Sequence, residues 1–181
     1  MKAKFSITDL EKSVKDIRNT ADKDEKSRLY QQYLSALRKL AYRNNAEAQY
    51  CLAVHYEDYG TMGDPNPYYN VSKKLYWYIK AANNNHASAC NNLADIYERG
   101  DGCKKDIRKA LELYKRAAEL GDWCGKKNYP HLKKQLKKVG LLDWAIGGVA
   151  PPQFDELLKQ LYNKVARVCD PCQRSKVKKN N

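Results

Sequence analysis

The sequence contains one cysteine pair with the spacing of half a zinc site, Cys169 and Cys172. A structural zinc ion needs four ligands, and the sequence offers only Cys103, Cys124 and His131 nearby, without a second paired motif. Ordinary reduced thiols are therefore the first interpretation, while a redox or disulfide pair and a zinc site remain alternatives. We expect no metal ion and no cofactor.

Residues suited to catalysis are scattered along the chain. The histidines His55, His86 and His131 do not cluster, and each is expected to serve in packing or helix capping. Asp95 and Glu98 have the spacing of ordinary solvated carboxylates on a helix. The sequence has no glycine-rich phosphate loop, nucleophile elbow, metalloprotease motif or paired-acid arrangement. We therefore predict that the protein is not an enzyme.

The residues best suited to binding are six lysines within 123–142, a segment without any acidic residue. On a helix the last four form one stripe, whereas Leu132, Leu136 and Val139 line another face. Such a stripe would bind acidic proteins or nucleic acids, the latter with a strong dependence on salt. The alternative is that these lysines only keep the helix soluble. The six candidate contacts are Lys126, Lys127, Lys133, Lys134, Lys137 and Lys138.

The formal net charge of +13 is concentrated near the C-terminal end. Residues 1–122 hold 21 basic and 17 acidic residues, a net +4, whereas residues 123–181 hold 13 and 4, a net +9. This excess favours an acidic partner, with solubility alone as the alternative. No apolar run reaches the roughly 20 residues of a membrane span, and residues 1–10 lack the apolar core of a secretion signal. We expect a cytoplasmic protein, with a nuclear compartment or a viral particle as alternatives, whose six cysteines are reduced.

The elements that position these residues follow from an internal repeat. Residues of 46–57 recur in 87–98 at an offset of 41, and residues of 74–82 recur in 110–118 at an offset of 36. The difference between these two offsets reflects an insertion at about 59–70 in the first copy. The glycines and prolines of this insertion exclude a helix. Each unit is therefore expected to be helix, loop, helix. The recurring positions of the first copy are Ala46, Ala48, Leu52, Ala53, Tyr56, Glu57, Tyr78, Ala81 and Ala82.

The recurring residue types indicate how the helices pack. Ala48, Leu52 and Ala53 share one face at helical spacing, and the alanines allow a paired helix to approach closely. Gly100 tolerates the positive φ at which the first helix of the second copy must end. Asp106 then stands where an N-cap would start the next helix.

These positions resemble the Sel-1-like repeat, a relative of the tetratricopeptide repeat. The segment 93–121 resembles a full repeat, 46–85 resembles one with a diverged loop, and 34–41 aligns with the second helix of a repeat. Residues 123–129 occupy a third first-helix position, with Gly125 in place of alanine. The resemblance implies an all-α, short, right-handed α/α solenoid with flanking capping helices. It also implies the assembly of protein complexes and gives no substrate.

We divide the chain into N-terminal helices with a half-repeat (1–45), two repeats (46–122), a degenerate repeat with capping helices (123–172) and a disordered basic tail (173–181). Thr8 and Glu11 have capping-box spacing, which predicts a first helix over about 8–19. A polar linker over 21–26 is expected to precede the second helix. The apolar pattern from Phe154 onward predicts a final amphipathic helix.

A solenoid binds extended peptides or partner domains on its concave face, through exposed side chains of its first helices. The candidate partner contacts on those helices are Tyr50, His55, Asn91, Asp95 and Arg99. Tyr68 and Tyr69 in the inserted loop are further candidates, since exposed aromatic pairs make good interface anchors. The predicted function is an adaptor or scaffold that binds a protein partner, with the basic C-terminal third supplying an acidic contact. The alternative is a nucleic-acid-associated protein that binds through this basic surface.

Overall fold

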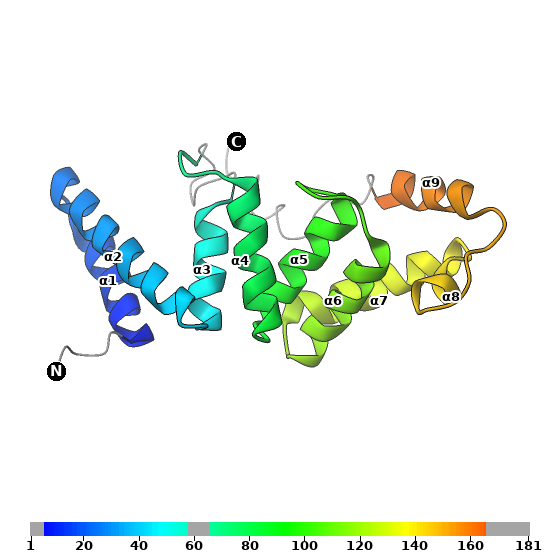
Figure 1. The fold of residues 1–181 in the computed structure, drawn as a ribbon, viewed down its shortest axis with the longest axis horizontal. Coiled ribbons are helices and arrows are strands. Elements are labelled where there is room, and N and C mark those ends of the chain that lie inside the picture. Colours follow the sequence, from blue (N-terminus) through cyan, green and yellow to red (C-terminus); the bar gives the residue numbers. More distant parts are fainter. Residues whose placement is uncertain (1–5, 58–65, 166–181) are drawn as a thin grey trace, which may run out of the picture. The chain divides into compact units, whose positions relative to one another are not determined.

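The computed structural model describes residues 6–57 and 66–165 (Figure 1). Every regular element within these ranges is a helix, which confirms the prediction of an all-α solenoid. The chain divides into two compact units, unit 1 (Met1–Asn128) and unit 2 (Tyr129–Asn181), so the boundary falls inside α7. The helices are α1 (Ile7–Asn19), α2 (Lys23–Tyr42), α3 (Ala46–His55), α4 (Val71–Asn83), α5 (Ala87–Arg99), α6 (Ile107–Glu119), α7 (Trp123–Lys138), α8 (Leu142–Ala145) and α9 (Phe154–Val165).

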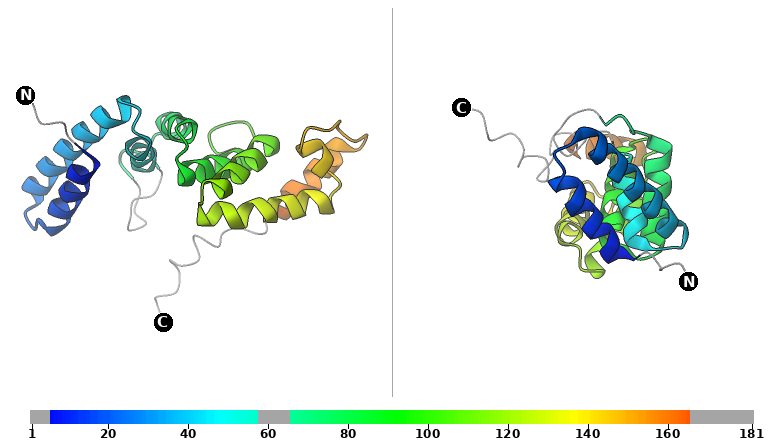
Figure 2. Two further views of the ribbon diagram at one scale, coloured as in Figure 1. Left: turned by 90° about the horizontal axis from the view of Figure 1, so that it is seen from below. Right: turned by 90° about the vertical axis from the view of Figure 1, so that its left-hand side faces the viewer.

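In unit 1 each helix from α1 to α6 packs against the next one along the chain. Helices α2 and α4 lie along one side of the unit, and α1 and α3 lie along the other (Figure 2). The predicted seam is confirmed, because Ala48, Leu52 and Ala53 of α3 are fully buried and so are Tyr78 and Ala81 of α4. Small side chains at the contacts let the helix axes approach closely, as a two-layer array requires.

Successive repeats are joined by the same two-residue turn. A residue with positive φ ends one helix, and the following residue caps the next helix with its side chain. These pairs are Asn44–Asn45, Asn85–His86 and Gly121–Asp122. Asparagine and glycine are the residues that adopt the left-handed conformation at least cost. The turn therefore fixes the angle at which each repeat follows the last.

The loop inside the second repeat also follows the prediction. Gly100 has a φ of 76° and ends α5, and Asp106 caps α6 by accepting from the backbone N–H of Lys109 at 3.0 Å. Gly102 has a further role, since a Cβ atom there would stand 2.0 Å from a methyl carbon of Val71. The loop of the second repeat thus lies directly against the start of α4.

Two expectations for the N-terminal helices are wrong. The capping box is formed by Ser6 and Asp9 rather than Thr8 and Glu11: the Ser6 amide donates to the Asp9 carboxylate at 2.7 Å, and the Asp9 amide donates to Ser6 Oγ at 3.3 Å. The same spacing occurs twice, and the earlier pair gives the longer helix. The expected linker over 21–26 is mostly helical, because α2 begins at Lys23, where acidic residues in the first turn favour the helix N-terminus.

Unit 2 has its own small set of buried residues. Its fully or nearly buried side chains are Leu132, Leu136, Val139, Leu141, Ala145 and Leu161. The rings of Trp144 and Phe154 pack with their centroids 4.6 Å apart, and the predicted final helix is α9. None of the helices in the described ranges is long and apolar enough to cross a membrane. Cys169, Cys172 and the tail 173–181 lie outside the described residues.

Candidate protein-interaction surfaces

A buried tyrosine and a partly buried glutamate join the two helices inside each repeat. The Tyr78 hydroxyl donates to Glu57 in the first repeat, and Tyr114 Oη donates to Glu98 Oε2 at 2.8 Å in the second. Burial raises the pKa of both tyrosines, and it also raises the pKa of Glu98. The interpretation of Glu98 as an ordinary solvated carboxylate is therefore wrong. The recurrence of Tyr and Glu in the sequence marks an internal bond rather than a ligand site.

Polar contacts also fix one repeat against the next. Lys74 Nζ, although buried, lies 2.6 Å from the Asp101 carboxylate in the loop of the second repeat. Ser88 Oγ donates to the carboxylate of Asp122, the N-cap of α7, at 2.9 Å. At the equivalent position of the first repeat, Glu47 lies 2.9 Å from Nε2 of His86, the N-cap of α5. These side chains are engaged in the array itself.

Two of the predicted contact residues pack inside the array. The first is Tyr50, whose ring stacks on the His86 ring with centroids 4.3 Å apart. His86 is itself the helix-capping residue that we expected, since its Nδ1 accepts from the Ala89 amide at 3.1 Å. Tyr50 is therefore half-buried. Asn91 is only 9% exposed and accepts from Asn128 Nδ2 at 2.9 Å. The prediction of Asn91 as an exposed contact is wrong, because α7 continues the array and covers that flank of α5.

Two other predicted residues come together with a residue from α2. His55 Nδ1 lies 2.8 Å from Tyr30 Oη, and the Tyr68 ring lies 4.8 Å from the His55 ring and 6.2 Å from the Tyr30 ring. We call Tyr30, His55 and Tyr68 the His55 cluster. Asn66 holds the turn that carries Tyr68, because its Nδ2 donates to the backbone carbonyls of His55 and Glu57, each at 2.7 Å. Sequence reasoning missed Tyr30, which is 25 residues before His55 and belongs to no repeated motif.

The surroundings of His55 disfavour its protonated form. Burial lowers the pKa of His55, and the charges of Arg38 and Lys73 lower it further. Burial also raises the pKa of Tyr30. His55 Nε2 is buried without a hydrogen-bond partner among the described residues. Tyr68 is 42% exposed, and its neighbour Tyr69 is 46% exposed. The Tyr68 ring is therefore held by the rings beneath it, whereas the Tyr69 ring lies 5.9 Å from Lys74 Nζ of α4.

Asp95 and Arg99 lie one turn apart on α5. Their side chains form an exposed ion pair of 2.8 Å, so both reach solvent as the sequence predicted. The pair belongs to the second repeat, whereas the His55 cluster belongs to the first repeat and α2. An exposed pair of this spacing contributes little to stability.

The six candidate lysines of α7 are all exposed, and Leu132, Leu136 and Val139 are buried, which confirms the predicted amphipathic pattern. In the part of the chain that the structure describes, none of the six pairs with a carboxylate. Lys126 and Lys127 lie in unit 1, and Lys127 Nζ stands 3.4 Å from the centre of the Trp123 ring. The other four, Lys133, Lys134, Lys137 and Lys138, lie in unit 2.

The start of α7 explains the glycine of the degenerate third copy. A Cβ atom at Gly125 would stand 2.7 Å from Ala117 Cβ and 2.8 Å from the backbone nitrogen of Ala118. The α7 backbone therefore approaches α6 more closely than an alanine allows. Asp122 caps this helix by accepting from the Gly125 amide at 2.7 Å. The segment thus forms a first helix that closes the array of unit 1.

Metal-binding chemistry finds no support within residues 6–57 and 66–165. No group of three or more histidine, cysteine, aspartate or glutamate side chains there could hold an ion. Cys51, Cys90, Cys103 and Cys124 are free thiols, and burial raises the pKa of Cys51 to about 11, which makes it a poor nucleophile. The thiol, disulfide and zinc alternatives for Cys169 and Cys172 stay predictions.

Paired helices, an alanine seam and a turn that recurs from unit to unit define an α-solenoid of helix-pair repeats. The family described as Sel1 repeat matches residues 46–86 and 87–122, which agrees with the array predicted over 46–122. Residues 46–122 are therefore similar to two Sel1 repeats, as the sequence pattern indicated.

Two proteins similar to this chain are longer than it is. Protein sel-1 homolog 2 of Homo sapiens is 38% identical over 97 residues, which make up 52% of this chain and 13% of that protein. The crystal structure of a Sel1 repeat protein from Oxalobacter formigenes matches 77% of this chain and 50% of its own, with a TM-score of 0.44 and 22% identity. The chain thus spans only a small part of the human relative and half of the bacterial one.

Proposed function

We propose that this chain is a non-catalytic scaffold that binds a protein partner mainly through Tyr68 and Tyr69 above the His55 cluster. Sel1 repeats serve protein–protein interaction, which supports the class of function. We choose this surface because the neighbouring tyrosines Tyr68 and Tyr69 are both nearly half exposed. In addition, the Tyr68 ring rests on His55 and Tyr30.

The physical argument rests on side-chain entropy and burial. Tyrosine is enriched at the centres of interfaces because it adds a large contact area and loses few rotamers on binding. Tyr68 has already lost much of this freedom, since its ring packs on His55 and its amide donates to Asn66 Oδ1 at 2.9 Å. Such preorganisation lowers the entropic cost of association. The exposed pair Asp95–Arg99 on α5 is a secondary contact within this proposal.

The basic C-terminal third supplies an accessory contact with acidic groups. An intracellular location belongs to the same proposal, because the four cysteines that the structure describes are free thiols, and thiols remain reduced there.

The test compares captured proteins from cell extract. Wild-type chain, a Tyr68→Ala/Tyr69→Ala variant and a Trp123→Ala control are used as baits, and bound proteins are quantified by mass spectrometry with and without nuclease. Trp123 is a matched control because it is an exposed aromatic residue away from the cluster. We expect at least one nuclease-resistant partner to be lost from the double variant and kept by the control. A partner that binds all three baits equally would show that the surface is wrong.

A second candidate function is nucleic-acid binding by the four lysines of unit 2. The observation in its favour is that these side chains are exposed without a carboxylate partner among the described residues. Each neutralised phosphate releases counterions, so affinity would fall steeply with salt. Changing Lys133, Lys134, Lys137 and Lys138 to glutamine should weaken binding to a generic duplex or RNA and flatten the salt dependence. If micromolar protein shows no binding at about 50 mM salt, this candidate is removed.

A further inference from the structure

One side of unit 1 lacks acidic residues along α4 and along α2 after its first turn. No aspartate or glutamate occurs between Glu25 and Glu47, which includes α2 from Lys26 onward, or between Asp64 and Asp95, which includes all of α4. These two helices lie along the same side of the unit (Figure 2). The equivalent helix of the second repeat, α6, carries both charges. The positive surface is therefore confined to the first part of the array.

The exposed residues of these helices form a connected patch. The Tyr42 ring of α2 meets the buried Trp77 ring of α4 edge-on at 5.3 Å, and the Tyr76 ring meets Trp77 from within α4 at 4.9 Å. Tyr42 is 72% exposed and Tyr76 is 47% exposed. Trp77 thus supports two exposed tyrosines that come from different helices.

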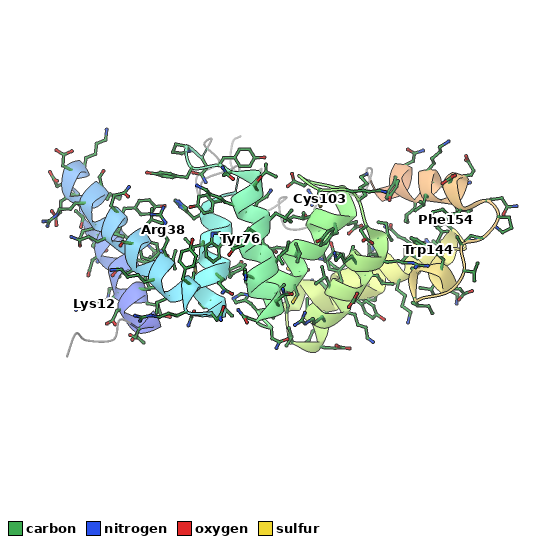
Figure 3. All side chains as sticks on the ribbon, viewed as in Figure 1. Lys12, Arg38, Tyr76, Cys103, Trp144 and Phe154 are labelled. Atoms are coloured by element: carbon green, nitrogen blue, oxygen red, sulfur yellow. The ribbon has the colours of Figure 1, made fainter. Side chains whose placement is uncertain are left out.

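Cations surround these tyrosines. A shallow depression of about 490 Å³ on α2 is lined by Ser35, Arg38, Lys39, Tyr42 and Arg43. On α4, Lys80 Nζ lies 5.7 Å from the centre of the Tyr76 ring. Lys39 and Lys80 occupy the same repeat position, at the offset of 41. Figure 3 shows Arg38 on α2 and Tyr76 on α4. None of these four cations pairs with a carboxylate in residues 6–57 and 66–165.

We propose that this surface, the α2–α4 patch, binds an acidic peptide segment of a protein partner. The patch consists of Arg38, Lys39, Tyr42, Arg43, Tyr76 and Lys80. Arginine and tyrosine are the residue types most enriched at interface centres. The arginine guanidinium binds carboxylates through two parallel hydrogen bonds, and the exposed tyrosines bury apolar parts of the same peptide.

A short peptide fits the charge distribution better than a nucleic acid does. Acidic residues resume on other helices of the unit, since Glu47 is exposed on α3, and Glu112 and Glu119 are exposed on α6. A continuous polyanion that follows the array would meet these carboxylates, whereas a peptide of a few residues need not extend beyond the patch. This surface does not include the tyrosines at 68 and 69 used in the proposed function, although the Arg38 charge acts on His55 beneath Tyr68.

The experiment measures fluorescence anisotropy of a labelled peptide in which Glu-Ser-Glu-Leu occurs three times, at about 50 mM salt. A peptide with glutamine in place of every glutamate is the ligand control. The test variant Lys39→Gln/Arg43→Gln/Lys80→Gln removes three charges across both helices. The matched variant Lys12→Gln/Lys15→Gln/Arg18→Gln removes three exposed charges from α1. Thermal unfolding by circular dichroism checks that both variants are folded.

We expect the test variant to bind the acidic peptide at least tenfold more weakly, while the α1 variant loses less than threefold. Tyr42→Ala should also weaken binding and leave its salt dependence unchanged, because it removes contact area without removing charge. Equal losses in the two triple variants would overturn the proposal in favour of net charge alone. Tighter binding of a single-stranded oligonucleotide to the same patch would overturn it as well. Tyr68→Ala/Tyr69→Ala should leave the peptide bound, so this test is independent of the proposed function.

Discussion

In the first repeat α4 has no acidic residue and exposes Tyr76, whereas the equivalent helix of the second repeat, α6, mixes both charges and carries an ion pair between Lys115 and Glu119. Beneath these different surfaces the interiors match. Ala81 and Ala117 are fully buried at equivalent positions, and each repeat contains the tyrosine–glutamate bond. Positions that recur along the chain therefore build the array, and positions that differ distinguish one surface from another.

The shared interior gives the largest expected effect. Replacing Ala81 or Ala117 with leucine adds three carbon atoms where two helices touch, and both alanines have no exposed surface. We expect each substitution to lower the free energy of unfolding by about 1–3 kcal/mol. Chemical denaturation measures this change. Comparable losses would confirm that the two seams are equivalent, and an unchanged midpoint for either variant would place that helix contact elsewhere.

The tyrosine–glutamate bond gives an effect of intermediate size. Tyr114→Phe keeps the ring but removes the donor to Glu98, which leaves a largely buried carboxyl group without that partner. We expect a loss of about 1–2 kcal/mol, because an unpaired buried polar group costs more than its hydrogen bond contributes. Tyr78→Phe should destabilise at least as much, because it also removes the acceptor for Asn92 Nδ2 at 3.1 Å. Phenylalanine at Tyr97, which is only partly buried, is the control, and a loss as large there would contradict the assignment.

The smallest effect is a pH dependence that involves Glu98. Burial raises its pKa in the folded protein above the ordinary value, so the folded state binds this proton more tightly than the unfolded chain does. Wild-type protein should therefore gain stability relative to Glu98→Gln as the pH falls from neutral through the raised pKa, and lose it again as the pH rises. Denaturation midpoints of both proteins across this range give the comparison. A difference that does not change with pH would mean that Glu98 is solvated.

The fold was largely predictable because its signals are local and repeated. Alanine, leucine and tyrosine at helical spacing identify the seam from the sequence. The second copy of the repeat then distinguishes the positions that build this contact from positions that resemble it by chance. Gly100 and Asp106 act as predicted for the same reason, since helix ends depend on a few neighbouring residues. The error at the first capping box has a local cause too, because two overlapping patterns compete and the sequence does not rank them.

The candidate surfaces were less predictable because exposure depends on which helix covers which flank. From the sequence alone Asn91 is expected to be a polar surface residue, but α7 covers it. In the same way Lys74 would be expected in solvent, but it is buried beside Asp101. Tyr30 joins His55 and Tyr68 from another helix, and Tyr42 meets Trp77 in the same way. Helical periodicity describes one helix at a time, so it does not reveal contacts of this kind.

The sequence by itself determined the helix-pair repeat, the alanine seam, the turns and the amphipathic character of α7. Each of these depends on residues within one or two turns of a helix, where spacing along the chain is equivalent to position in space. Only the tertiary structure decided that Tyr50 and Asn91 pack inside the array, that Glu98 is largely buried, and that Tyr42 and Tyr76 share a support in Trp77. The physical reason is that burial and charge environment are set by the packing of different helices, to which residues far apart in sequence contribute.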